Sequence, residues 1–154
     1  MSDKKILCIN TLIEMSKTIR LDDITVLTLA ETAGVKRTTF YYNFSSIRDV
    51  VRCYFLAFPL TNTHLIGDIK RLIEAITHRL DDDNEFIINL ITQRGYRDVV
   101  FEVVYAWSLL YFKKVISDKT KSSFVAAGFA QTLIDIYGSK EKNYLRLENI
   151  IKAI

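Results

Sequence analysis

Proline, glycine and cysteine are scarce in this chain, and their scarcity favours one architecture. Of 154 residues, one is proline and five are glycine, so few positions interrupt a regular helix. A fold of short strands and turns needs many such residues. The two cysteines, Cys8 and Cys53, have no second cysteine or histidine at ligand spacing. We therefore expect reduced thiols, no metal site and no bound cofactor.

Targeting segments and catalytic motifs are also missing. Residues 1–5 are polar and are not followed by the unbroken apolar stretch of a signal peptide. The most apolar stretch, 99–112, contains Glu102 and Ser108 and is too short to span a bilayer. There is no glycine-rich phosphate loop, nucleophile elbow or His-Glu metal motif. We expect a soluble cytoplasmic protein that is not an enzyme and makes no membrane contact.

The composition that is present describes a globular protein with an uneven distribution of charge. Hydrophobic residues make up 49% and charged residues 25% of the sequence, which is enough apolar surface for a packed core. The formal net charge is only +3. Residues 36–52, however, contain Lys36, Arg37, Arg48 and Arg52 against a single acidic residue, Asp49. This local excess is the distribution expected of a segment that meets nucleic-acid phosphates.

Apolar residues recur at steps of three and four along most of the chain, which predicts helices throughout. Thr25, Ser46 and Ser139 are suitable helix N-caps, and Gly34 and Gly138 are suitable helix ends. No stretch alternates as a strand would. The sequence therefore predicts an all-α fold of nine helices, over residues 3–19, 26–33, 36–42, 46–58, 61–80, 84–92, 98–116, 123–137 and 140–154.

The segment 25–44 has the spacing of a helix-turn-helix. Ala30 is small enough for two helices to cross closely, Gly34 permits the turn, and Val35 fills the space between the helices. Phe40 and Phe44 lie one helical turn apart and can anchor the second helix on the core. The outward positions of that helix are then Arg37, Thr38, Tyr41 and Asn43, whose side chains suit phosphates and base edges.

The run Leu29-Ala30, Ala33-Gly34-Val35 and Thr39-Phe40-Tyr41-Tyr42-Asn43-Phe44 resembles the DNA-binding signature of the TetR (tetracycline-repressor) family. The resemblance covers about the first third of the chain. It implies a DNA-binding domain at 1–45, with a recognition helix at 36–42, and a helical regulatory and dimerisation domain at 46–154. Ile47 replaces a lysine that is common in the family, so we expect Arg48 to take its phosphate contact. The DNA contacts implied by the resemblance are Thr25, Thr28, Lys36, Arg37, Thr38, Thr39, Tyr41, Asn43 and Arg48.

The family resemblance also implies a homodimer, which we place at residues 123–154. Ala126, Ala127, Gly128 and Ala130 would let helices approach closely. A second apolar stripe follows in the last helix, and two helices from each subunit would form a four-helix bundle. The predicted function is a transcription regulator, a repressor that binds a palindromic operator of double-stranded DNA as a homodimer. The apolar stripe of the last helix, 140–154, consists of Tyr144, Leu147, Ile151 and Ile154.

A small-molecule effector that releases the DNA is the last element of this hypothesis. Phe101, Tyr105, Ser108 and Phe112 recur on one face of the helix at 98–116, giving three rings and one hydroxyl. Such a face suits an apolar pocket with one orienting polar group. Because Glu102 is the charged residue nearby, we expect a neutral or cationic guest. A competing interpretation is that these rings only fill the core.

Three residues of the helix-turn-helix allow a second interpretation. Tyr41 and Tyr42 could be half-buried packing residues, a role that we expect of Tyr42 more than of Tyr41. Thr25 could act as a helix cap alone.

The chain could also be a helical protein-interaction module without an operator or effector, although such an interface would expose apolar side chains where this sequence has Arg37 and Asn43.

Overall fold

Helices form all of the regular structure in the part of the chain that the computed structural model describes, residues 2–57, 60, 67–93 and 95–139. Eight α-helices and one short 3₁₀ turn, Leu21–Asp23, follow one another without a strand in these residues. The predicted all-α class is confirmed. The predicted last helix, 140–154, lies outside the described residues, as do positions 61–66 of the predicted fifth helix. No helix in the described residues combines the length and apolar character needed to cross a membrane.

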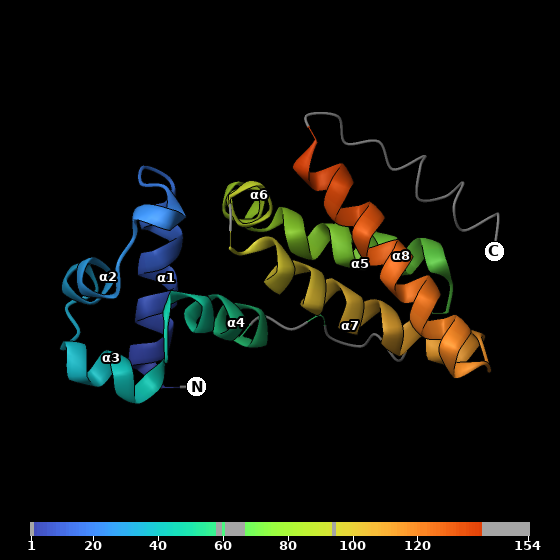
Figure 1. Cartoon of the computed structure of the whole chain (residues 1–154), viewed down its shortest axis with the longest axis horizontal. Helices are drawn as coiled ribbons and strands as arrows, with labels where there is room; N and C mark the ends of the chain where they lie inside the picture. The colour runs from blue at the N-terminus through green and yellow to red at the C-terminus, as the bar shows by residue number, and fades with distance from the viewer. Residues whose placement is uncertain (1, 58–59, 61–66, 94, 140–154) are drawn as a thin grey trace.

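The N-terminal half is a small cluster of four helices, seen at the left of Figure 1. These are α1 (Asp3–Ser16), α2 (Val26–Thr32), α3 (Arg37–Asn43) and α4 (Ile47–Ala57). α1 packs against α2 and α4, and α2 packs against α3. The shared core includes Leu12, Leu29, Phe40 and Val50, all buried. Burial of these side chains, at about 1.5 to 3 kcal/mol each, holds the short α2 and α3 in place, because helices of this length are marginal alone.

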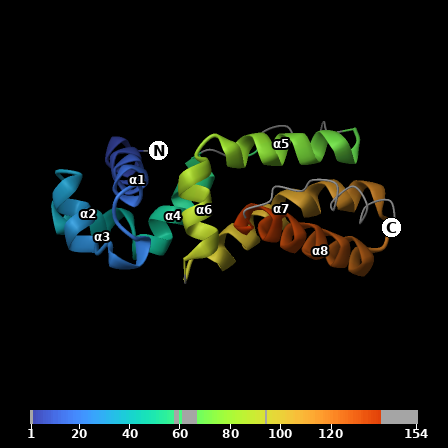
Figure 2. The ribbon, with the colours of Figure 1, turned by 90° about the horizontal axis from the view of Figure 1, so that it is seen from above.

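The C-terminal half contains α5 (Ile69–Asp81), α6 (Asn84–Thr92), α7 (Arg97–Val115) and α8 (Lys119–Gly138). α7 and α8 lie side by side as a long hairpin, as Figure 2 also shows, and α6 packs against both of them. α5 packs against α6 and α7. Asp68 and Asp118 begin α5 and α8 by accepting backbone hydrogen bonds from Arg71 and Lys121 at 2.9 and 2.7 Å.

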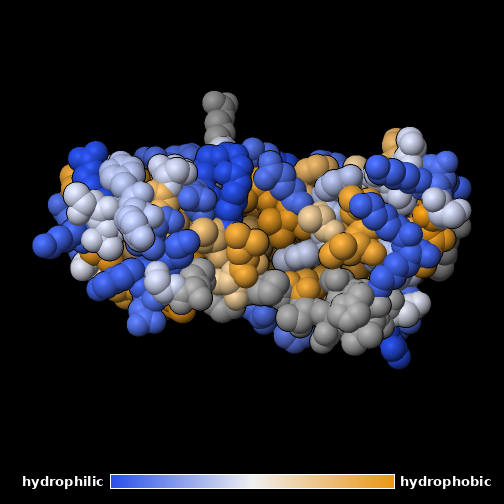
Figure 3. Space-filling view, turned by 90° about the horizontal axis from the view of Figure 1, so that it is seen from below, coloured by the Kyte–Doolittle hydropathy of each residue, from blue (hydrophilic) through white to orange (hydrophobic). Residues whose placement is uncertain are grey.

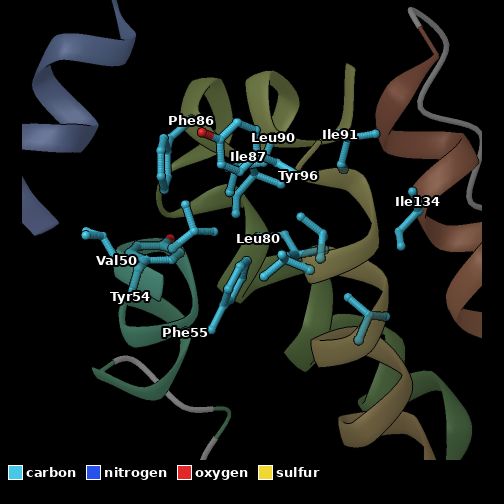
Figure 4. Packing of buried hydrophobic residues seen from close by; sticks show 14 of the residues in the cluster. Val50, Tyr54, Phe55, Leu80, Phe86, Ile87, Leu90, Ile91, Tyr96 and Ile134 are labelled. Atoms are coloured by element: carbon cyan, nitrogen blue, oxygen red, sulfur yellow. The ribbon is translucent and has the colours of Figure 1, made fainter. Parts of the chain in front are cut away.

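The two halves share one hydrophobic core around α4. Tyr54 and Phe55 point from α4 toward the second half (Figure 4), where the ring of Tyr54 lies 5.2 Å from that of Phe86 and the ring of Phe55 lies 6.2 Å from that of Trp107. α4 also contacts α7, and α1 contacts α6. α4 follows α3 after a short turn, so the helix that contacts the second half is joined directly to the end of α3.

Candidate nucleic-acid interface

The turn between α2 and α3 has the geometry that the sequence predicts. Gly34 adopts a φ of +63°, a conformation that side chains other than glycine rarely adopt. Ala30 and Val35 are buried, and the Val35 amide donates to the Ala30 carbonyl at 2.8 Å. The roles expected of these three residues are confirmed: Ala30 is the small residue where the helices cross, Gly34 makes the turn and Val35 fills the space between the helices. The turn therefore fixes the angle at which α3 leaves α2.

The beginning of α2 is closed by a reciprocal pair of threonines. The Thr28 amide donates to the Thr25 hydroxyl at 3.1 Å, and the Thr25 amide donates to the Thr28 hydroxyl at 3.0 Å. This is a capping box, with Thr28 in the place often taken by glutamate. The capping role of Thr25 is thus observed. Both side chains remain exposed, and their DNA contacts stay a prediction.

α3 is held from one side by two phenylalanines. Phe40 and Phe44 are buried, and their rings lie 5.3 Å apart. On the opposite side Lys36, Arg37 and Thr38 are exposed, and Thr39 is half-buried, with its carbonyl accepting a hydrogen bond from Asn43. The Tyr41 side chain is 49% exposed, with the Arg37 guanidinium carbon 5.6 Å from the centre of its ring. The predicted separation of anchors from outward polar residues is therefore confirmed for Arg37, Thr38 and Tyr41.

Tyr42 differs from the expectation. We expected a half-buried packing residue, but its side chain is 90% exposed, the largest value among the exposed hydrophobic residues of the described chain. The reason is helical geometry: Tyr42 is two positions, about 200°, from the buried Phe40. The spacing of Phe40 and Phe44 was therefore a sufficient signal for this residue. Tyr42 joins Tyr41 as an aromatic hydroxyl on the outward side of α3.

Asn43 is more constrained than predicted. Its side-chain amide nitrogen donates to the Thr39 carbonyl at 2.8 Å, and its amide oxygen accepts from the Ser2 hydroxyl at 3.4 Å. The side chain is half-buried. Both polar ends of Asn43 thus have partners within the chain, so its first role is to close α3 and tie the N-terminal segment to it.

Arg48 is the clearest departure among the predicted DNA contacts. Its guanidinium donates to both carboxylate oxygens of Asp98, at 3.2 and 2.6 Å, and also to the Gly95 carbonyl. These partners belong to the second half of the molecule, because the helical turn at Arg48 faces α7. The geometry does not support the phosphate contact, and Arg48 is instead a link between the two halves.

A basic residue outside the predicted set of DNA contacts lies near the end of α3. The Lys5 ammonium is 5.8 Å from the centre of the Phe44 ring, so α1 brings a cation to the corner between α3 and α4. The adjacent residues Lys4 and Lys5 in the first turns of α1 were the available signal. Figure 3 shows a mostly hydrophilic surface at the end of the molecule that carries α2 and α3. The basic residues near α3 are Lys5, Lys36 and Arg37, and cations of this kind suit a phosphate backbone.

The four predicted effector residues do not share one pocket. Ser108 is fully buried and donates to the Val104 carbonyl at 2.6 Å. Phe112 is buried, with its ring 5.8 Å from that of Phe129. Phe101 and Tyr105 are half-buried and stack on each other, with 6.0 Å between ring centres. Because α8 covers only one arc of α7, the predicted face is divided: Ser108 and Phe112 fill the core, and Phe101 and Tyr105 lie at its edge.

The described part of the predicted dimer segment, residues 123–139, is also divided between buried and exposed positions. Ala126 and Ala130 are buried within the chain, whereas Ala127 and Gly128 are not fully covered. Ala126 and Ala130 are one helical turn apart and so lie on the inner face of α8. The outer face instead carries Phe124, whose side chain is 80% exposed. The apolar stripe of the predicted last helix lies outside the described residues.

No protein-family model matches the sequence, and no curated protein matches it either. Among solved structures, the chain is similar to the dihydroxyacetone kinase operon activator DhaS, with a TM-score of 0.64 and 15% sequence identity. The alignment covers 98% of this chain and 93% of that chain. At this identity the likeness concerns the fold alone. The chain therefore shares the all-α fold of that regulator over nearly its whole length.

Proposed function

We propose that this chain is a sequence-specific DNA-binding transcription regulator whose α3 enters the major groove. The observation that carries the proposal is the arrangement of α3, in which Phe40 and Phe44 are buried while Arg37, Tyr41 and Tyr42 project outward. A recognition helix needs this separation, because the anchors fix its position and the outward side chains meet the DNA. The sequence resemblance to the TetR family and the similarity in fold to DhaS both agree with it.

The outward residues divide into two chemical roles. Arg37 has the planar guanidinium that pairs with the O6 and N7 atoms of guanine, so we assign it a base contact. Lys5 and Lys36 are cations at the two ends of α3, and we assign them phosphate contacts. Thr25, Thr38, Tyr41 and Tyr42 supply hydroxyls that donate to phosphate oxygens or base edges, whereas the Thr28 hydroxyl donates to the Thr25 carbonyl at 3.0 Å.

The regulator acts as a homodimer on a palindromic operator and represses by occupying it. α8 supports this extension, because its outer face presents Phe124 to solvent. Addition of a Cβ atom at Gly128 would meet no atom within 4 Å in the isolated chain. A second copy of α8 can therefore approach there closely. A two-fold axis along this face would repeat α3 on successive turns of one side of the DNA.

The direct test is selection of binding sites from a random pool of DNA duplexes by the purified chain. We expect enrichment of an inverted repeat whose half-sites are about 10 base pairs apart, or a multiple of that spacing. The Arg37→Ala variant should lose the enrichment at one base pair of each half-site. Lys113→Ala, which removes an exposed cation at the far end of α7, is the matched control and should select the wild-type sequence. A pool without any enriched sequence would refute the proposal.

A second candidate function is a helical protein-interaction module. Three large exposed side chains on α2 and α3 favour it: Leu27, Tyr41 and Tyr42. Aromatic residues of this kind are enriched in protein interfaces. The same selection experiment discriminates between the two candidates, because a protein-interaction module would retain duplexes without sequence preference or not at all.

A further inference from the structure

Several polar links between the two halves of the molecule meet within a short segment, residues 89–93 and 95–98, at the end of α6 and the beginning of α7. The Asn89 side chain donates to the Ser16 carbonyl at 3.0 Å, and the Gln93 side chain accepts from the Leu21 amide at 2.7 Å. Arg48 of α4 donates to Gly95 and Asp98. This segment therefore holds α1, the 3₁₀ turn and α4 at once, and a ligand bound beside it can influence all three.

A cavity of about 470 Å³, largely open to solvent, lies directly against this segment. Its volume is within the range of small-molecule sites, roughly 300 to 1,000 Å³. The cavity lies where α4, α7 and α8 meet, and it contains one aromatic ring among polar groups. Its walls are formed by Arg48, Gly95, Arg97, Asp98, Phe101 and Gln131.

The walls offer two guanidinium groups to one occupant. The Arg97 side chain is 42% exposed and pairs with Asp135 through one terminal nitrogen. A guanidinium has five N–H donors, so this pairing leaves others that can face a guest. Gln131 donates to the same Asp135 carboxylate at 3.0 Å, which holds its amide beside Arg97. Arg48 also lines the cavity and is oriented by Asp98 and Gly95.

The groups present select the chemistry of the guest. Two planar guanidiniums suit a carboxylate, which can accept two parallel hydrogen bonds from such a fork. Phe101 adds an apolar ring to the wall, and Tyr105 supports that ring by stacking, with 6° between the planes. A flat ring that carries a carboxylate satisfies both features. The sequence led us to expect a neutral or cationic guest, but only a carboxylate would use the N–H donors of Arg48 and Arg97 that Asp98 and Asp135 leave unpaired.

We propose that the cavity between α4, α7 and α8 binds a small planar aromatic carboxylate, with its carboxylate on Arg97 and Arg48 and its ring against Phe101. The site differs from the face predicted from sequence, because Ser108 and Phe112 are core residues and only Phe101 is common to both. It also differs from a passive surface hollow, because Arg48 is both part of its wall and the link from α4 to α7.

Occupancy of the site has a consequence for α4, which rests on the proposed function. A ligand carboxylate that accepts hydrogen bonds from Arg48 competes with Asp98 for the same guanidinium. The ion pair between α4 and α7 then weakens, and the conformations in which α4 leaves α7 become more populated. Since α4 is joined to α3 by a short turn, the affinity for the operator falls.

The binding test uses the full chain and sodium benzoate as the probe. Isothermal titration calorimetry measures the affinity. We expect saturable binding, weakened about tenfold or more by Arg97→Gln, because a charge-assisted hydrogen bond is lost. Phe101→Leu should also weaken benzoate binding. Lys113→Gln, on the same helix but outside the cavity, should bind as wild type does, and thermal melting checks that each variant is folded. Benzamide, the neutral counterpart of the probe, should bind far more weakly.

Three results would overturn the site: no saturable binding of benzoate to the folded wild-type chain, equal binding by Arg97→Gln, or equal affinity for benzamide. The regulatory consequence has a separate measurement, the operator affinity with and without benzoate by fluorescence anisotropy. Benzoate that binds without changing operator affinity would refute the link through Arg48. A chain that binds benzoate but selects no DNA sequence would refute the proposed function and leave the site standing.

Discussion

At the scale of single residues, Arg37 is the side chain on which DNA recognition most depends. It projects from α3 and contacts Tyr41, another exposed residue, so its removal leaves the core intact. We predict that Arg37→Ala weakens operator binding by about 1 to 3 kcal/mol, the value of one bidentate base contact. Stability should change little. Fluorescence anisotropy and thermal melting measure the two quantities, and operator binding by Arg37→Ala equal to that of wild type would contradict the assignment.

Tyr54 is a single residue on which we expect the stability of the fold, and not DNA recognition, to depend. Its hydroxyl donates to Asp83 at 2.8 Å and accepts from Arg79 at 3.1 Å, so it connects α4, α5 and the turn before α6. Burial raises the pKa of this phenol above its ordinary value, so the hydroxyl remains a donor throughout the neutral range. Tyr54→Phe keeps the ring and removes both hydrogen bonds.

We predict that Tyr54→Phe lowers the free energy of unfolding by about 1 to 3 kcal/mol, because two groups that are withdrawn from water each lose a partner. Urea denaturation measures the change. Tyr105→Phe is a suitable control, since the Tyr105 ring is half-buried at the edge of the core, and it should cost much less. Equal stability of Tyr54→Phe and wild type would mean that the network has no net effect.

At the scale of helices, the sequence was a reliable guide where local signals coincide with burial. The predicted helix at 84–92 agrees in both bounds with α6, and the one at 98–116 is displaced from α7 by a single residue. The beginning of α8 was missed, because Lys119, Thr120 and Lys121 are a polar run that resembles a loop. The structure begins the helix there since Asp118 caps it and Ser122 is buried.

The choice of face along a helix was less predictable than its bounds. Periodicity finds that Phe101, Tyr105, Ser108 and Phe112 share a side of α7, but it does not state how much of that side α8 covers. Arg48 posed the same difficulty, because its partners Gly95 and Asp98 are far away in sequence. Short-range signals such as the Gly34 turn were therefore predictable, whereas roles that depend on packing between helices were not.

Gly34 supplies the prediction at this scale, since it sets the angle between α2 and α3. Its φ of +63° is strained for any residue with a Cβ atom, although no neighbour would clash with one. We predict that Gly34→Ala lowers the free energy of unfolding by about 1 to 2 kcal/mol through backbone strain alone. Gly67→Ala is the matched control, because Gly67 has open space around its Cα and lies outside the positive-φ region, so the substitution should stabilise by roughly 0.4 to 1 kcal/mol. Chemical denaturation that gives the same sign for both variants would contradict this explanation.

At the scale of the whole molecule, the ion pair between Arg48 and Asp98 makes the connection between the halves sensitive to pH. The hydrogen bond from Arg48 lowers the pKa of the Asp98 carboxyl below its ordinary value. A carboxyl whose pKa is lowered in the folded state stabilises that state above its unfolded pKa and loses the effect as the pH falls through the folded value. This ion pair should therefore be intact at neutral pH and be lost only in acid.

We predict that Asp98→Asn is less stable than wild type at neutral pH and that the difference decreases in acid, as the pH falls through the lowered pKa of the wild-type carboxyl. The difference should be small and should decrease with salt, because the Asp98 side chain is 60% exposed. Denaturation curves at several pH values measure it. A difference that persists in acid would assign the effect of the substitution to packing and not to charge.

The last prediction concerns the assembly of two chains. A side chain as apolar as Phe124, 80% exposed on α8, is expected at an interface, and the outer face beside it is nearly flat at Gly128. Phe124→Glu should convert a dimer to a monomer, because it places a charge where apolar surfaces meet, and should leave the helical content unchanged. Light scattering at micromolar concentration measures the mass. Leu56→Glu, which changes another exposed apolar residue, on α4, should remain dimeric. The Phe124→Glu monomer should also bind the operator more weakly than the wild-type dimer, since a single α3 reads only half of a palindrome. A wild-type chain that is monomeric under these conditions would refute both the dimer and the palindromic operator.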